Sequence, residues 1–208
     1  MKNEKINLKI KSNKYKYLFL LILIILGIIS GIIFSNILSF NDKKDISLTI
    51  ASYLEHLKNN DQINYIKNLI ESLKNNFLYL ILIVIFSLSV IGVILNPIIL
   101  YFKSFIIGFN IGIMITIYSF KGIILGIFSV FPHQFINLLI YLFISFNGIN
   151  LSIKLFKFIF FKKQYNFTII IKKYFNMIAV SCIILVLTSL YETFLGDFLL
   201  KVFTFLLK

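Results

Sequence analysis

Residues 17–38 read YLFLLILIILGIISGIIFSNIL and contain no charged side chain. A helix needs about 20 apolar residues to cross the hydrocarbon core of a bilayer, which is about 30 Å thick. The stretch is too long for the apolar part of a signal peptide, and no small-residue cleavage site follows it. It therefore predicts a retained membrane-spanning helix.

The composition of the whole chain is also that of a membrane protein. Of its 208 residues, 59% are hydrophobic and only 14% are charged, whereas about 25% are charged in an average soluble domain. The abundance of Ile, Leu and Phe excludes a disordered chain. A single cysteine, Cys182, excludes a secreted domain held together by disulfides.

Four more apolar segments follow the first one. Asn96 and Pro97 are expected to end the second helix, and Lys103 shortens the third, which could be tilted or re-entrant. Pro132 is expected to kink the fourth, because that segment is too long for one straight span. We predict an all-α polytopic membrane protein, one domain over 1–208, with five transmembrane helices at 17–38, 77–95, 98–120, 122–153 and 175–195.

Lysines are concentrated in two parts of the chain and predict its orientation. The tail 1–16 carries a net charge of +5 and the loop 154–174 carries +6, out of +13, whereas the loop 39–76 is neutral. Because cytoplasmic segments are enriched in lysine, both basic segments are expected in the cytoplasm, with 39–76 and the tail 196–208 outside. The lysines would also attract anionic lipid. Nucleic-acid binding is not expected, since the chain has neither arginine nor a soluble domain.

The outer loop has two apolar stripes at helical spacing, and Asp61 lies where it could cap the second. We predict two short amphipathic helices outside the membrane. They either pack on the bundle or dock an extracytoplasmic partner, and both interpretations stay open. The stripes consist of Ile46, Ile50, Leu54 and Leu57, and of Ile63, Ile66, Ile70 and Leu73.

Six of the nine glycines form pairs spaced four residues apart. Such pairs allow two helix backbones to approach closely within a membrane. We expect tight helix packing, within the chain rather than between subunits. The pairs are Gly27 with Gly31, Gly108 with Gly112, and Gly122 with Gly126.

Several polar residues fall at or near membrane depth, where they are costly unless they face the bundle or a cavity. One interpretation is a polar patch that stabilises a kinked helix, and the other is a proton relay or substrate path. The polar candidates are Asn110, Ser129, His133, Gln134, Asn137 and Glu192, and Pro132 is the candidate for the kink. The chain has no phosphate loop, zinc-protease motif or serine-hydrolase motif. We therefore expect no enzyme activity, metal or cofactor.

Three motifs resemble the stage II sporulation protein M family. They are KSFIIGFNIG at 103–112, KGIILGIFSVFPHQ at 121–134 and SLYE at 189–192. In the wider superfamily His-Gly-x-x-Glu often follows the proline, and here Gln134 replaces the glycine and Asn137 the glutamate. The departure puts any chemical role of that glutamate in doubt.

The resemblance implies a multi-pass protein of the bacterial mother-cell membrane that is needed for septal peptidoglycan dissolution and forespore engulfment. It implies a non-enzymatic scaffold that recruits two peptidoglycan-degrading partners, stage II sporulation proteins P and D. The alternative is a transporter or permease subunit with a binding site at the broken helix near Pro132.

Overall fold

The computed structural model describes residues 2–58, 65–126, 131–196 and 198–199, and within these ranges the side chains of 2–12, 54, 56–58, 125 and 131 are not described. The described residues form helices and no strand. The helices are α1 (Lys2–Ile37), α2 (Phe40–Lys58), α3 (Tyr65–Ser87), α4 (Gly92–Leu125), α5 (Phe131–Phe161), α6 (Phe167–Tyr191) and a π-helical turn, η2 (Glu192–Gly196).

Five of these helices are long and apolar enough to cross a membrane, which confirms the predicted all-α, five-span plan. The spans lie in α1, α3, α4, α5 and in α6 together with η2. Within the described residues, the apolar part of α5 is the most deeply buried, with 61% of it inside the protein. Helix α5 is therefore the centre of the bundle.

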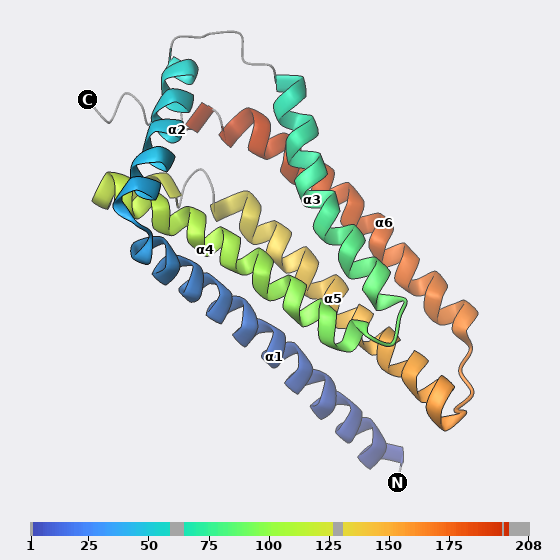
Figure 1. Ribbon diagram of the computed structural model, residues 1–208. Coiled ribbons are helices and arrows are strands. Elements are labelled where there is room, and N and C mark those ends of the chain that lie inside the picture. The colour runs from blue at the N-terminus through green and yellow to red at the C-terminus, as the bar shows by residue number, and fades with distance from the viewer. Residues whose placement is uncertain (1, 59–64, 127–130, 197, 200–208) are drawn as a thin grey trace.

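Apart from α2, the long helices run side by side along one long axis (Figure 1). Helix α1 lies on one flank and packs mainly against α4, while α3 and α6 cover the other side of α5. Large apolar side chains fill the core between them. Those with essentially no exposed surface include Leu20, Leu80, Ile83, Leu100, Tyr141, Leu142, Ile144 and Leu185.

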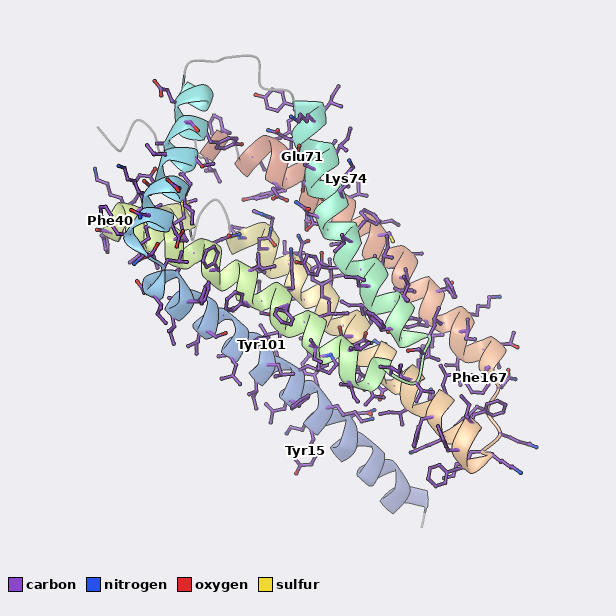
Figure 2. All side chains as sticks on the ribbon, in the orientation of Figure 1. Tyr15, Phe40, Glu71, Lys74, Tyr101 and Phe167 are labelled. Atoms are coloured by element: carbon purple, nitrogen blue, oxygen red, sulfur yellow. The ribbon has the colours of Figure 1, made fainter. Side chains whose placement is uncertain are left out.

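Glycines form the contact between α1 and α4. A Cβ at Gly31 would meet the backbone of Phe105 and Phe109, and one at Gly108 would meet the carbonyl of Ile28. The hydroxyl of Tyr101, which lies on α4 beside α1, also pairs with Ser30 Oγ at 2.9 Å (Figure 2). Gly27 and Gly112 make similar close approaches to the opposite helix. The two backbones thus approach too closely for any side chain at these positions.

The third glycine pair does not join two helices. A Cβ at Gly122 would meet the backbone of Met114 in the same helix, because α4 bends sharply at Ser119, whose φ is 52° and ψ −129°. Gly126 has ordinary space around it, since a Cβ added there would lie 3.7 Å from Ile111 Cγ2. Only the first two pairs therefore form a helix interface.

The turn between α3 and α4 lies at 88–91, not at Asn96 and Pro97 as expected. Asn96 is fully buried in α4, and its amide donates to Ser87 Oγ at 2.8 Å. Ser152 of α5 donates to the carbonyl of Ser87 at 3.0 Å. These contacts explain why Asn96 can lie inside a helix, since its side-chain amide is hydrogen-bonded to the end of α3. Pro97 is accommodated inside α4.

The second span begins and ends earlier in the chain than the predicted 77–95. Helix α3 runs without interruption from Tyr65 to Ser87, so Ile66, Ile70 and Leu73 of the second stripe are its first part and not a separate helix. The other stripe residue, Ile63, and the predicted cap, Asp61, lie outside the described residues. Among the polar residues 74–76, Asn76 is 2% exposed and hydrogen-bonded inside the bundle. It can therefore remain helical at a depth where an unpaired amide would be costly.

The predicted kinked helix over 122–153 is wrong. Residues 122–125 end α4, and α5 begins at Phe131, with Pro132 in its first turn. Proline is tolerated there because the first N–H groups of a helix have no intrahelical partner. The kink instead lies at Ser119, in α4. Ser129 falls outside the described residues.

The two lysine-rich segments meet at one end of the bundle. Lys16 Nζ in α1 donates to Asn150 Oδ1 in α5 at 2.8 Å, close to Lys154 and Lys157. In Figure 2, Tyr15 and Phe167 lie toward this end, whereas Phe40 of α2 lies at the opposite end. The positively charged segments thus share one side, as a common cytoplasmic location would require.

Candidate functional site: a buried polar cluster

Eight polar side chains from three helices and the π-helical turn meet inside the bundle, toward the end where α2 lies. We call them the polar cluster. All of them except Glu192 are buried, and Asn137, Tyr141 and Ser189 have no exposed surface. The cluster consists of Ser72 and Asn76 from α3, His133, Asn137 and Tyr141 from α5, Thr188 and Ser189 from α6, and Glu192 from η2.

Asn76 is the centre of the cluster. Its amide Nδ2 donates to Ser189 Oγ at 3.0 Å, and its Oδ1 accepts from Asn137 Nδ2 at 3.1 Å. Its backbone carbonyl accepts from the hydroxyl of Tyr141 at 2.9 Å. The amide nitrogen and the amide oxygen of Asn76 are both hydrogen-bonded, so this residue links α3 to α5 and to α6.

A second link joins α5 directly to α6. Thr188 Oγ1 donates to Asn137 Oδ1 at 2.6 Å, while Asn137 Nδ2 donates to Asn76. Hydrogen bonds between membrane helices are worth about 0.6 kcal/mol each on average. Several together hold the three helices in one register, and leaving any partner unsatisfied would cost more than the bond itself.

Glu192 closes the cluster at its outer end. Its Oε2 accepts from Ser72 Oγ at 2.5 Å, and its Oε1 lies 3.5 Å from His133 Nε2. The side chain of Glu192 is 34% exposed, whereas that of His133 is only 5% exposed. The π-helical turn that begins at Glu192 interrupts the regular α-helical phase, as such turns often do at functional positions.

Lys103, which was expected to shorten the third span, lies in the bundle near this cluster. It is 6% exposed, and its Nζ lies 4.5 Å from the ring centre of Tyr79 and 5.8 Å from that of Tyr141. A cation over an aromatic face is stabilised by the ring quadrupole. This attraction, together with the field of the Glu192 carboxylate, explains how α4 accommodates a lysine inside the bundle.

The hydrogen bonds of the polar cluster join helices that are far apart in the sequence. Ser72 donates to one oxygen of the Glu192 carboxylate, and His133 faces the other, so this carboxylate links α3 and α5 to η2. Across the described residues, no group of three His, Cys, Asp or Glu side chains could hold a metal.

Residues 20–196, which include the whole polar cluster, match the model of a family described as stage II sporulation protein M. The chain belongs to the stage II sporulation protein M family. The family membership and the five apolar helices indicate a sporulation-related, multi-pass membrane protein. No curated protein and no solved structure matches the chain.

In this family member, three of the polar candidates taken from the sequence lie together. His133 and Asn137 are one turn apart on the buried face of α5, and Glu192 reaches His133 from η2. The side-chain oxygen of Gln134 is buried and has no hydrogen-bond partner among the described residues. Pro132 is half-buried where α5 begins.

Sequence reasoning missed the other members of the cluster in this sporulation protein, and with them the neighbouring Lys103. The missed members are Ser72, Asn76, Tyr141, Thr188 and Ser189. A signal was available, because Ser72 and Asn76 are four residues apart, as are His133 and Asn137, so each pair lies on one helix face. The first pair is not evident from the sequence, because it falls in 39–76, whose polarity is typical of a loop outside the membrane.

Proposed function

We propose that the protein is a non-enzymatic membrane scaffold for septal peptidoglycan dissolution and forespore engulfment during sporulation. The observation that carries the proposal is the family match over residues 20–196. The hydrogen bonds of the polar cluster support it, because they join three helices into one bundle. A rigid bundle of this kind can present fixed surfaces to other membrane proteins.

The proposed partners are the peptidoglycan-degrading stage II sporulation proteins P and D. Helix α2 offers a surface for their outer domains, since it has only slight contact with the bundle. Two of its large apolar side chains are strongly exposed, Phe40 at 81% and Leu48 at 59%. Exposed apolar side chains on an amphipathic helix suit docking to a protein or to the membrane interface.

The proposed location is the mother-cell membrane, with the N-terminus in the cytoplasm and α2 outside. The meeting of the lysine-rich segments at one end supports this orientation, because cytoplasmic segments are enriched in lysine. Helix α2 extends from the opposite end, where the peptidoglycan would be (Figure 1).

A transporter subunit has less support. It requires a cavity that reaches His133, Gln134 and Asn137. Two cavities of about 600 Å³ that the described residues form are lined by other side chains. Asn137 is fully buried, and both its amide nitrogen and its oxygen are hydrogen-bonded within the bundle.

Sporulating cells that lack the protein provide the test. We expect them to retain the septum and to mislocalise the peptidoglycan hydrolase, while expression of the wild-type chain restores both. Normal engulfment with the hydrolase at the septum would contradict the proposal. In a separate assay, the purified protein should release no fragments from peptidoglycan, and release by the isolated chain would show an enzyme instead.

A further inference from the structure

A cavity of about 620 Å³ lies at the lysine-rich end of the bundle, between α1, α5 and α6. Its wall combines polar and apolar side chains. The polar part holds four lysines, Lys16, Lys154, Lys157 and Lys173, with the amides of Asn13, Asn147 and Asn150. The apolar part includes Phe146, Ile153, Ile169, Ile170 and Met177.

Positive charge is concentrated in this cavity. None of the described residues that line it is acidic. Lys154 and Lys157 of α5 repel the ammonium of Lys16 in α1, which is half-buried and donates to Asn150 Oδ1. Like charges that are drawn together in a partly desolvated site favour the binding of an anion.

An apolar groove continues from this cavity along α5 and α6. It has a volume of about 600 Å³, and it shares Lys173 and Met177 with the cavity. Its other walls are almost all apolar, from Ile136, Leu139, Ile140, Phe143, Val180 and Ile184. Between Lys173 and Ile184 a helix rises about 16 Å, which is roughly the depth of one leaflet of a 30 Å hydrocarbon core.

We propose that the cavity and groove bind one anionic phospholipid from the leaflet at the lysine-rich end. The phosphate of the headgroup lies among Lys16, Lys154, Lys157 and Lys173, and an acyl chain follows the groove between α5 and α6. Charge complementarity selects the headgroup, and the continuity of the basic cavity with the apolar groove selects a lipid over a free anion. The bound lipid fastens the basic end of α1 to α5 and α6.

Native mass spectrometry of the full-length chain in neutral detergent tests the headgroup site. We expect phosphatidylglycerol to bind and phosphatidylcholine not to compete. The double variant Lys16→Gln, Lys157→Gln should bind about 25-fold more weakly, at about fivefold per lysine. Lys16→Arg, Lys157→Arg should keep the affinity, since it retains both charges. The control Lys163→Gln, Lys172→Gln removes the same charge outside the cavity and should bind normally.

If the control variant weakened lipid binding equally, the headgroup site would be overturned. The loss of affinity would then reflect only the lower net charge of the protein. Equal binding of phosphatidylcholine would do the same. Inorganic phosphate that displaces phosphatidylglycerol at millimolar concentration would overturn the lipid as the ligand and leave a free-anion site.

Two exposed residues of α6 test the groove. Val180 lines it and is 57% exposed, whereas Leu187 lies outside it and is 59% exposed. Val180→Trp should weaken lipid binding severalfold, and Leu187→Trp should not. A photo-reactive residue at position 180 should cross-link to phosphatidylglycerol in membranes. Cross-links to a second copy of the chain or to another protein's transmembrane segment would overturn the proposal.

Discussion

At the residue scale, the glycines of α1 and α4 and the amides of the polar cluster determine how the helices approach. Glycine removes the side chain where two backbones meet, at Gly31 and Gly108. The amides of Asn76 and Asn137 form a directional hydrogen bond between α3 and α5. The glycine contact depends on the shape of the helix surface and the amide contact on hydrogen bonding, so each contact can be tested by its own substitution.

We predict that Gly108→Ala destabilises the protein by about 1–3 kcal/mol, because its Cβ would meet the carbonyl of Ile28 and force α1 away from α4. The matched control is Gly126→Ala, where the nearest atom, Ile111 Cγ2, is at an ordinary distance of 3.7 Å. Unfolding of the purified chain with increasing dodecyl sulfate in mixed micelles, followed by circular dichroism, measures both. Equal stability of the two variants would contradict this interface.

We predict that Asn76→Ala lowers the free energy of unfolding by about 1–3 kcal/mol, since it leaves Asn137 and Ser189 without their partner. Asn110→Ala is the control, because Asn110 is an exposed amide on α4. The same mixed-micelle unfolding experiment compares them. A loss no larger at Asn76 than at Asn110 would mean that the polar cluster contributes nothing to stability.

At the element scale, apolar length predicted the number of spans but not their ends. The five spans follow from runs of apolar residues that are too long to remain in water. Their ends depend on whether a polar residue finds a partner inside the bundle. Asn96 and Lys103 do find one, so α4 continues through both positions. Sequence periodicity carries no information on such partners, which come from other helices.

The orientation of the elements gives a further prediction. In a Cys182→Ser background, a cysteine in place of Asp45 in α2 should react with a membrane-impermeant maleimide in intact protoplasts. A cysteine in place of Lys163, in the turn between α5 and α6, should react only after permeabilisation. Both original side chains are exposed, so access through the membrane is the variable. Labelling of position 163 in intact protoplasts would show that this turn faces the outside, and it would contradict the predicted orientation.

At the scale of the whole molecule, the two ends of the bundle differ in character. One end has the lysine-lined cavity, and the other has the polar cluster with Glu192 and the exposed apolar side chains of α2. Sequence predicted this division from lysine distribution and from the stripe on residues 46–57. It predicted only His133, Asn137 and Glu192 of the polar cluster. The hydroxyl-bearing members were missed because such a side chain can bond to its own helix, so its presence in a span does not predict a partner elsewhere.

The central claim is that this bundle recruits peptidoglycan-degrading proteins and does not act on peptidoglycan itself. The most direct measurement is affinity purification of the tagged chain from sporulating membranes, with the co-purified proteins quantified by mass spectrometry. We predict that stage II sporulation proteins P and D are recovered with the wild-type chain, and that recovery falls at least severalfold for Phe40→Ser, Leu48→Ser in α2. A wild-type chain that purifies without either protein would contradict the account.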